Sequence, residues 1–377
     1  MSAFATLPDP CSTVRVIQVG AGGMGRVWLE LLASTADVTV VGLVDLDVDL
    51  AHAALTELAV SGVIVGTSVT EVAAFVDAHA VINVTVPVAH HPVTTEALFL
   101  GFPVLSEKPI APTVAQTLSL AAAAEVTGQL LMTSQSRRYY RSLKEFRRLL
   151  QSIGRVGILT TDFFVAPRFG GFRDEMPFPL LVDMAIHPFD VARYLLGANP
   201  TSVYCESFNP PWSWYAGDAA TTAIFEFADG ARYTYTGSWC SGGLETSWNG
   251  SWRASGSGGT ATWNGEDSPL GAGFDGNGLA PLSVGSDAEG LEVIAGALAE
   301  FIASLRTGNA PSGEVHSNLF SLAMVEAAVR SAETGARVAI ADVLEAALES
   351  AIAGERRADV RAALKSWGSA ADHLANG

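Results

Sequence analysis

The chain has 377 residues, of which 49% are hydrophobic and 16% are charged. This balance excludes an intrinsically disordered chain, and the length indicates two globular domains. There are 22 lysine and arginine residues against 39 aspartate and glutamate residues, which gives a net charge of −17. A negative field of this size repels phosphate backbones and anionic lipid surfaces, so we expect neither nucleic acid nor a membrane among the partners.

The three cysteines, Cys11, Cys205 and Cys240, are widely spaced. Their number and spacing favour buried, inert thiols over a disulfide framework or a zinc site, and we expect no bound metal. Residues 1–13 lack the basic and apolar segments of a secretory signal, and no run of about 18 uncharged apolar residues occurs. We therefore expect a cytoplasmic protein.

Short β-branched runs alternate with helical segments between Val14 and Thr133, a pattern typical of βαβ units around a buried parallel sheet. The six predicted strands are residues 14–19, 38–44, 63–65, 80–86, 103–106 and 129–133. Helix-forming composition predicts helices that include residues 24–33 and 114–127. Six strands with crossovers predict an N-terminal Rossmann domain of doubly wound α/β class over residues 1–134.

Beyond Ser134 the pattern changes to that of an α+β domain with a large, mostly antiparallel sheet, predicted over residues 135–377. A basic helix at 137–150 precedes strand candidates at 161–165, 201–208, 222–239 and 251–263. Asp229-Gly230 predicts a hairpin turn within the third of these. The Gly- and Pro-rich stretch 271–287 predicts a loop, whereas helices are predicted at 291–305 and 319–334 in this second domain and along the tail at 342–374.

A glycine-rich loop, GAGGMG, follows the first predicted strand and opens the first predicted helix. The first glycine permits a tight turn, the second lets the backbone approach a pyrophosphate, and the third allows close packing of helix on strand. The residues of this loop that we expect to bind a dinucleotide are Gly20, Gly22, Gly23, Met24 and Gly25. The alternative is an ordinary tight turn between strand and helix.

Asp45 ends the second predicted strand, about 20 residues beyond Gly25, where a carboxylate accepts hydrogen bonds from the adenosine ribose. The alternative for Asp45 is a helix cap. Asp45 and Asp47 together would repel a 2′-phosphate, and no Arg or Lys lies near them in the sequence. The sequence therefore predicts NAD rather than NADP as the cofactor.

Two further segments follow the fourth and fifth strands, whose carboxyl ends lie beside the nicotinamide half of such a site. One is Thr85-Val86-Pro87-Val88-Ala89-His90, and the other is Glu107-Lys108-Pro109. The residues in them that we expect to line the cofactor are Thr85, Pro87, His90, Glu107 and Lys108. Lys108 is also a candidate for the reaction and for substrate binding, and the alternative is a solvated surface lysine.

In the second domain Asp183 and His187 are four residues apart, so on a helix both side chains share one face, with Asp190 on about the same side. A carboxylate beside an imidazole raises its basicity and fixes its orientation, which suits a general base for a hydroxyl proton. The alternative is a local ion pair or a helix cap. Pro188 disfavours helical conformation at His187 and predicts a kink or a helix start there.

Together these motifs resemble, in order and approximate spacing, those of the Gfo/Idh/MocA oxidoreductases, the family of glucose-fructose oxidoreductase and inositol dehydrogenase. The resemblance implies that Lys108 and His187 lie near the reacting carbon and that Asp183 helps to position the substrate. It also implies a cis peptide bond between Lys108 and Pro109 and assembly into homodimers or homotetramers. Val86 departs from the family pattern, where many members have proline, and this leaves the path of that loop open.

The expected activity is hydride transfer between NAD and a secondary alcohol of a sugar, inositol or related polyol. Two aromatic loops, residues 166–179 and 209–217, carry Arg168 and Arg173, which could stack on a sugar ring and bond its hydroxyls. The alternative is that these loops pack between the two domains. Two other functions remain open: a lyase or glycosidase-like enzyme that oxidises its substrate transiently with NAD, and a non-catalytic sugar sensor. The presence of both Lys108 and His187 favours an enzyme over the sensor.

Overall fold

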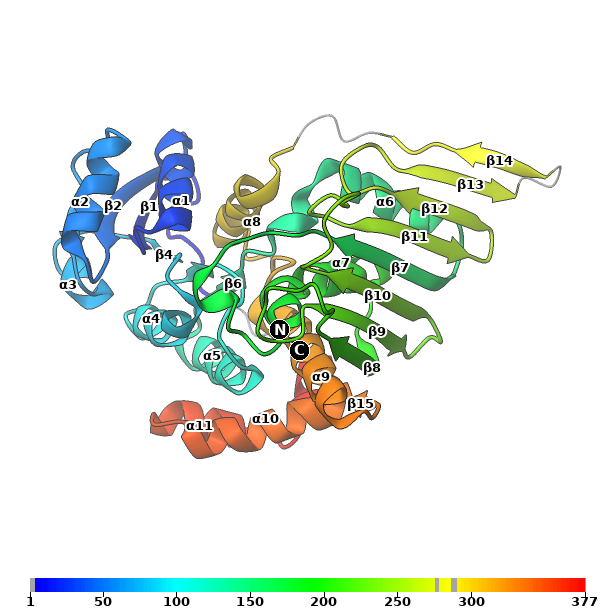
Figure 1. Cartoon of the computed structure of the whole chain (residues 1–377). Helices are drawn as coiled ribbons and strands as arrows, with labels where there is room; N and C mark the ends of the chain where they lie inside the picture. Colours follow the sequence, from blue (N-terminus) through cyan, green and yellow to red (C-terminus); the bar gives the residue numbers. More distant parts are fainter. Residues whose placement is uncertain (1–3, 275–277, 286–289, 377) are drawn as a thin grey trace. The chain divides into compact units, whose positions relative to one another are not determined.

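The computed structural model describes residues 4–274, 278–285 and 290–376. The chain divides into two compact units (Figure 1). Unit 1 contains residues 1–135, 294–319 and 344–377, and unit 2 contains residues 136–293 and 320–343. The first of these boundaries lies one residue after the change of domain that the sequence predicts at residue 134. Residues 294–319 and 344–377, which we assigned to the second domain, instead belong to unit 1.

Unit 1 is built on a six-stranded sheet in the order β3-β2-β1-β4-β5-β6, in which every pair of neighbours is parallel. This is the strand order of a doubly wound dinucleotide-binding fold. The strands are β1 (Val14–Val19), β2 (Val38–Val44), β3 (Ile64–Gly66), β4 (Ala80–Asn83), β5 (Val104–Ser106) and β6 (Leu131–Thr133). All six predicted strands are confirmed, with shifts of a few residues at some ends.

Helices connect these strands, as expected for parallel neighbours. They are α1 (Gly23–Ser34), α2 (Val48–Glu57), α3 (Val69–Ala73), α4 (Pro87–Phe99) and α5 (Val114–Thr127). Every residue of β4 and β5 is buried, which explains why these strands are apolar along most of their length rather than alternating.

The C-terminal segments of unit 1 extend the Rossmann domain. They comprise α8 (Val293–Thr307), the start of α9 (Val315–Thr334), most of α10 (Ile340–Gly354), α11 (Ala358–Ser366) and α12 (Ala370–Asn376). The amide of Thr133 donates to the carbonyl of Gly313 at 2.8 Å, and α11 packs on α5. Helical composition predicts a helix but not the sheet on which it packs, so the sequence placed these segments in the wrong unit.

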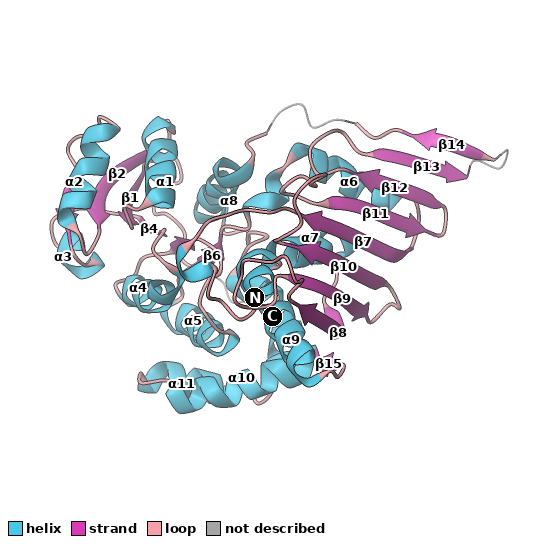
Figure 2. Ribbon diagram, viewed as in Figure 1, coloured by secondary structure: helices cyan, strands magenta, loops and turns pink. Residues whose placement is uncertain are grey.

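Unit 2 contains a nine-stranded, mostly antiparallel sheet, as predicted, in the order β14-β13-β12-β11-β7-β10-β9-β8-β15 (Figure 2). The strands in chain order are β7 (Val156–Phe164), β8 (Pro200–Phe208), β9 (Ala220–Phe227), β10 (Arg232–Ser238), β11 (Ser251–Gly256), β12 (Gly259–Trp263), β13 (Leu270–Phe274), β14 (Leu279–Leu282) and β15 (Val338–Ala339). Among the described strands of this second sheet, only the β10–β7 pair is parallel. The predicted hairpin at Asp229-Gly230 joins β9 to β10, and Gly230 has a φ of +90° there.

Helices α6 (Arg141–Ser152) and α7 (Ile186–Leu196) pack on this sheet. Phe189 of α7 makes an edge contact with Phe225 at 4.7 Å between ring centroids, and Phe146 of α6 lies 6.0 Å from Trp263. Burial alternates along β9, β11 and β12, so one face of the sheet forms the core of unit 2.

Three expectations from the sequence need correction. Residues 251–263 form the hairpin β11–β12 rather than one continuous strand, and most of the predicted loop 271–287 lies in or between β13 and β14. Strand pairing overrides the low intrinsic strand preference of this Gly-rich sequence. Of the predicted loop 271–287, residues 275–277, 286 and 287 lie outside the described residues. Cys205 and Cys240 are buried thiols, but Cys11 is exposed.

Among the described helices, none has the length and apolar character needed to cross a membrane.

Candidate active site

The glycine loop between β1 and α1 is fixed by two close approaches of the backbone. Gly20 has a φ of +102°, and a Cβ on it would lie 2.5 Å from the carbonyl oxygen of Val84. A Cβ on Gly25 would lie 2.3 Å from the carbonyl oxygen of Gly20. The buried Gln18 side chain donates through Nε2 to the carbonyls of Gly20 at 2.8 Å and Gly25 at 2.7 Å. Gln18 is not among the predicted site residues. A polar residue inside an apolar strand directly before the loop could have indicated that its side chain bonds the loop.

The middle of the same loop is open. A Cβ on Gly22 or Gly23 would meet no atom within 4 Å. Gly22 is the N-cap of α1 and has no side chain with which to satisfy the first N–H groups of the helix. Free N–H groups and the positive end of the helix dipole form a ready site for phosphate. The loop thus fits the pyrophosphate of a dinucleotide, and Met24 beside it is 48% exposed.

Asp45 follows β2 and is bonded to the glycine loop. Its Oδ2 accepts from the amide of Ala21 at 2.8 Å, and its Oδ1 accepts from the amide of Asp47 at 3.0 Å. The N-cap of α2 is Asp47, which accepts from the amides of Asp49 and Leu50. The helix-cap alternative therefore applies to Asp47, whereas Asp45 holds a half-buried carboxylate at the edge of the loop.

The segment after β4 is organised by buried polar groups. Thr85 donates through Oγ1 to Asn83 Oδ1 at 2.8 Å. His90 is 1% exposed, with Nδ1 at 2.6 Å from the carbonyl oxygen of Pro109 and Nε2 at 2.9 Å from that of Thr85. Burial lowers the pKa of His90, although these two carbonyl contacts oppose the shift. Its ring nitrogens face the protein's own backbone, so His90 joins the segments that contain Thr85 and Pro109.

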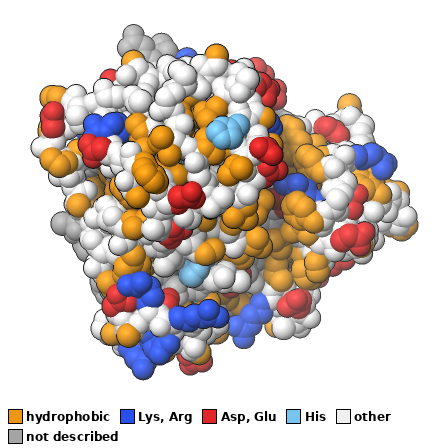
Figure 3. Space-filling view, turned by 90° about the vertical axis from the view of Figure 1, so that its left-hand side faces the viewer, with side chains coloured by type: hydrophobic (Ala, Val, Ile, Leu, Met, Phe, Trp, Pro, Cys, Tyr) orange, Lys and Arg blue, Asp and Glu red, His pale blue; other side chains and the backbone are white. Residues whose placement is uncertain are grey.

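Val86 and Pro87 give the path of the loop that the family resemblance left open. Val86 has an extended backbone and is the N-cap of α4, and Pro87 is the first residue of that helix. Val86 is 63% exposed and Val88 is 74% exposed, and Leu46 beside Asp45 is 90% exposed. Exposed apolar side chains thus flank the polar groups at the carboxyl ends of these strands. On the face drawn in Figure 3, apolar side chains likewise lie between acidic and basic ones.

Lys108 follows β5 in a rigid setting. The Lys108–Pro109 peptide bond is cis, as the resemblance implies. Glu107 accepts from the Trp28 indole at 2.8 Å through Oε1 and from the amide of Lys108 at 3.1 Å through Oε2. Burial raises the pKa of Glu107, which the Trp28 hydrogen bond and the nearby Lys108 partly offset. Glu107 therefore acts as a positioning residue, and no sequence signal identified Trp28 as its partner.

Within unit 1 the predicted residues thus meet at one edge of the sheet. The glycine loop follows β1, Asp45 follows β2, Thr85 follows β4 and Lys108 follows β5. The carboxyl ends of parallel strands share one edge, which is where doubly wound folds bind their ligands.

Asp183 and His187 belong to unit 2, where the local helix differs from the prediction. Asp183 lies in a π-helical turn, Leu180–Met184, and His187 lies in the first turn of α7 after Ala185. The helix start near Pro188 was expected, but the π-helical turn was not. Both side chains are partly exposed. Asp183 Oδ2 lies 2.6 Å from Nε of Arg173, so the ion-pair alternative holds with Arg173 as the partner.

Asp190 does not share the setting of Asp183. Its side chain is 2% exposed and binds Arg138 through both oxygens, at 2.7 and 2.6 Å. Ser321 donates to the same carboxylate at 2.6 Å, and Arg193 lies 3.7 Å away. Asp190 therefore belongs to a buried structural network, whereas Asp183 is partly exposed.

The two aromatic loops of unit 2 pack on each other through their arginines and rings. The exposed Arg168 guanidinium lies 3.9 Å from the ring centroid of Trp214, and Arg173 lies 4.7 Å from that of Phe172. Tyr215 donates through its hydroxyl to the carbonyl of Pro167 at 2.9 Å. Burial raises the pKa of Tyr215 to about 12. Within unit 2 the two loops therefore pack on each other, while the Arg168 side chain stays exposed.

Comparison with known proteins agrees with this architecture. Residues 14–135 match the model of an oxidoreductase family with an NAD-binding Rossmann fold, and residues 152–262 match the GFO/IDH/MocA C-terminal domain. The two models together span more than half of the chain. The fold and the glycine-loop edge thus define an NAD-binding Rossmann protein. The chain belongs to the Gfo/Idh/MocA oxidoreductase family, as its motifs indicated.

Among curated relatives, the chain is 33% identical over 236 residues to "Uncharacterized protein y4oX" of Sinorhizobium fredii, covering 60% of this chain and 66% of the relative. It is 31% identical over 196 residues to inositol 2-dehydrogenase 4 of Saccharopolyspora erythraea, covering 50% and 56%. The matches thus span about half to two thirds of these relatives.

A solved structure with the same fold is an oxidoreductase from Agrobacterium radiobacter in complex with NAD+, L-tartaric acid and magnesium. It superimposes with a TM-score of 0.78 at 18% identity and covers 88% of this chain and all of the other.

Proposed function

We propose that the protein is an NAD-dependent dehydrogenase that oxidises a secondary alcohol of a sugar, inositol or related polyol. The observation that carries this proposal is the edge of the first sheet, where the open glycine loop, Asp45 and Lys108 follow β1, β2 and β5 of one parallel sheet. This combination offers a phosphate site, a ribose acceptor and a cation within one rigid unit.

The proposed cofactor is NAD rather than NADP. Asp45 presents a carboxylate beside the glycine loop, and Asp47 adds a second one at the start of α2. Two carboxylates favour the free hydroxyls of an adenosine ribose and repel a 2′-phosphate. The exposed apolar side chains of Met24 and Leu46 offer a surface for the adenine ring.

The proposed catalytic residues are Lys108, Asp183 and His187. When bound, the nicotinamide supplies the acceptor for the hydride from the substrate carbon. His187 removes the hydroxyl proton, and the Lys108 ammonium stabilises the negative charge that develops on that oxygen. Asp183, held by Arg173, orients the substrate or the histidine. For reduction of the ketone, His187 returns the proton.

The proposed substrate class rests on chemistry and on the relatives together. Inositol 2-dehydrogenase 4 of Saccharopolyspora erythraea is among the relatives. Arg168 presents a guanidinium beside the Trp214 ring, and such a pair suits the hydroxyls and the apolar face of a cyclic polyol. We therefore propose Arg168 as a substrate-binding residue.

The first test is NADH formation across inositols, aldoses and sugar acids, repeated with NADP. We expect turnover on one of these classes with NAD, and a fall of about 10²–10⁴-fold in kcat for Lys108→Ala. Lys365→Ala, at an exposed position of α11, is the control. A preference for NADP would overturn the assignment of Asp45. NAD binding without turnover on any of these substrates would overturn the dehydrogenase and favour transient oxidation or sugar sensing.

We propose further that the protein forms a homodimer or homotetramer through the face of the second sheet that α6 and α7 do not cover. Ile158 and Ile224 are 56% and 36% exposed on neighbouring parts of this sheet. Open antiparallel sheets commonly bury such a face against a second copy. Light scattering on the purified protein distinguishes a monomer from these assemblies, and Ile158→Lys is expected to shift the equilibrium toward monomer.

A further inference from the structure

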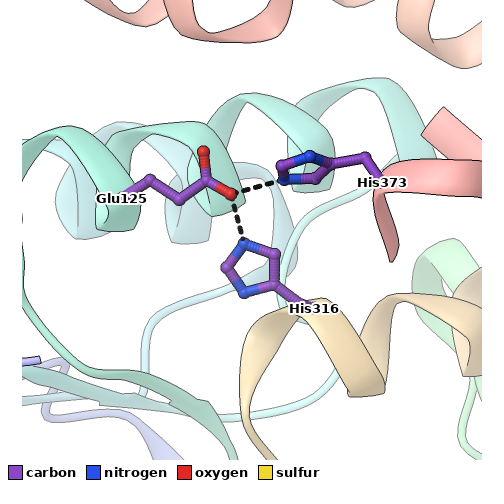
Figure 4. Close-up of side chains that lie close together, drawn as sticks. All are labelled: Glu125, His316 and His373. Atoms are coloured by element: carbon purple, nitrogen blue, oxygen red, sulfur yellow. Dashed lines mark hydrogen bonds and ion pairs between the residues drawn. The ribbon is translucent and has the colours of Figure 1, made fainter. Parts of the chain in front are cut away.

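Two of the seven histidines in the sequence converge on one glutamate within unit 1, away from the glycine-loop edge (Figure 4). Glu125 lies near the end of α5, His316 lies in the first turn of α9, and His373 lies in α12. The ligand atoms of these three residues all lie within 4.8 Å of one another. His316 and His373 fall outside the regions matched by the family models, so the cluster is a feature of this chain that the family assignment does not explain.

We propose that Glu125, His316 and His373 form a binding site for a divalent transition-metal ion, with zinc as the ion whose ligand preferences they match. Zinc in proteins takes imidazole nitrogens and carboxylate oxygens, commonly as three protein ligands with water in the fourth position.

The distances support this assignment. Nε2 of His316 lies 3.0 Å from Oε1 of Glu125, and Nε2 of His373 lies 2.7 Å from the same oxygen. Both dashed lines in Figure 4 end on that oxygen. Ligand atoms around a tetrahedral zinc, each about 2.0–2.1 Å from the ion, lie about 3.3 Å apart. The two distances to Glu125 would lengthen by about 0.3 and 0.6 Å to reach this spacing, which side-chain rotations can supply.

The outer contacts are those that orient metal ligands. Nδ1 of His316 lies 2.7 Å from Oε1 of Glu314, a carboxylate–histidine pair that leaves Nε2 directed at the site. The indole of Trp367 donates to Oε2 of Glu125 at 3.0 Å, so Oε1 is the oxygen that faces both histidines. The His373 ring stacks on Trp367 with centroids 4.3 Å apart and planes 11° apart. Each of the three ligands is therefore held in place by a second contact.

Charge and access also suit a divalent cation. Glu125 contributes a carboxylate whose Oε1 lies 3.0 Å from Nε2 of His316 and 2.7 Å from Nε2 of His373. Glu125 and Glu314 together balance the two positive charges of the ion when the imidazoles are neutral. The side chain of His316 is 10% exposed and that of His373 is 31% exposed, which leaves the ion a path from solvent and room for a water ligand.

The proposed metal joins three segments that are far apart in the sequence. Glu125 is separated from His316 by 191 residues and from His373 by 248. A bound ion would fasten α12 and the start of α9 to α5 of the Rossmann domain. Because the ion binds the folded chain more tightly than the unfolded one, it would raise the stability of unit 1.

The test uses full-length protein without a histidine tag, stripped with EDTA and titrated with Zn²⁺ by calorimetry. We expect one equivalent of Zn²⁺ to bind and the thermal midpoint to rise on binding. Co²⁺ in the same site is expected to give the visible absorption of tetrahedral nitrogen and oxygen coordination. Glu314→Gln, which alters only an outer contact, is expected to weaken binding by about 10–100-fold. His373→Ala and His316→Ala, which each remove a ligand, are expected to weaken it more.

His52→Ala removes an exposed histidine of α2 and is the matched control, with unchanged Zn²⁺ affinity expected. Circular dichroism establishes that each variant is folded, and the Co²⁺ spectrum of the wild type tests the site without any substitution. Failure of the stripped wild type to bind Zn²⁺ and Co²⁺ stoichiometrically would overturn the proposal. Equal affinity in wild type and folded His373→Ala would also overturn it, and the cluster would then be a hydrogen-bonded clamp. Dehydrogenase activity enters none of these measurements, so the outcome is independent of the proposed function.

Discussion

The glycine-loop edge of unit 1 and the Asp183–His187 segment of unit 2 are built in different ways. At the glycine-loop edge, side chains are fastened to the backbone. Gln18 bonds two loop carbonyls, Asp45 accepts two amides, and Glu107 accepts the amide of Lys108. In unit 2, Asp183 pairs with the long side chain of Arg173, which also lies over the Phe172 ring.

The difference bears on how each region serves the proposed reaction. Backbone contacts fix a phosphate and ribose site that depends little on side-chain rotamers, as binding of an invariant cofactor requires. Contacts between side chains on loops adapt more easily when the substrate changes. The first region thus suits recognition of a common cofactor, and the second suits selection of a particular polyol.

The largest expected effect is on the free energy of unfolding, and it distinguishes Asp190 from Asp183, seven positions earlier in the sequence. Asp190→Ala leaves Arg138 and Arg193 buried without their carboxylate, and we expect it to lower the free energy of unfolding by about 3–5 kcal/mol. Asp183→Ala breaks a partly exposed pair, and we expect less than about 1 kcal/mol. Urea denaturation of both variants measures the difference.

In catalysis we expect the reverse order, with the larger direct effect on kcat/KM in Asp183→Ala. Because Asp183 is proposed to orient the substrate or His187, Asp183→Ala is expected to lower kcat/KM by about 10²-fold while the protein stays folded. Equal losses of stability in the two variants would show that Asp183 is as structural as Asp190, and the contrast between the two carboxylates would fail.

A second prediction compares two glycines of one loop. Gly25→Ala places a Cβ 2.3 Å from the carbonyl oxygen of Gly20, so the backbone must shift. We expect a loss of about 1–3 kcal/mol in the free energy of unfolding. Gly23→Ala meets no atom within 4 Å, so stability should change by less than about 0.5 kcal/mol.

NAD affinity should nevertheless fall in Gly23→Ala by at least about tenfold, because the added methyl group fills space that the pyrophosphate needs. Calorimetric titration with NAD measures this affinity, with wild type as the reference. Unchanged NAD affinity in Gly23→Ala would mean that the open part of the loop does not hold the cofactor.

The sequence predicted the backbone-built region better than the loop-built region for a physical reason. Glycines and an acid at fixed spacing are required by a tight turn and a nearby helix start, which are local features. The pairing of Arg173 with Asp183 depends on how a loop folds back on a π-helical turn, and no periodicity reports that. The same limit explains why the helices after residue 293 were assigned to the second domain. Their composition predicts helix, but it does not show which unit they pack on.

The setting of His90 depends on packing that its motif does not describe. The segment from Thr85 to His90 matches the family pattern, yet His90 faces the carbonyls of Thr85 and Pro109 inside the unit. Sequence places the residue in the correct loop, but the direction of its side chain follows from the packing of α4 against the Pro109 turn. The Glu125 cluster illustrates the same limit, since its three members come from segments that sequence spacing does not relate.

The smallest expected effect concerns another link between a side chain and the backbone in unit 1. His79 accepts through Nδ1 from the amide of Arg15 at the start of the sheet, at 3.2 Å, and this contact needs a neutral Nδ1. Burial lowers the pKa of His79 below 6.5, and the charge of Arg15 lowers it further. The unfolded chain therefore binds the proton more readily than the folded chain. The contribution of this contact to stability is present above pH 6.5 and is lost as the pH falls through the folded-state pKa.

Urea denaturation between about pH 5 and pH 8 should show this loss in wild type and a shallower one in His79→Gln, with His52→Gln as the control for removing an exposed imidazole. The same slope in wild type and His79→Gln would mean that the Arg15 contact does not depend on the neutral ring.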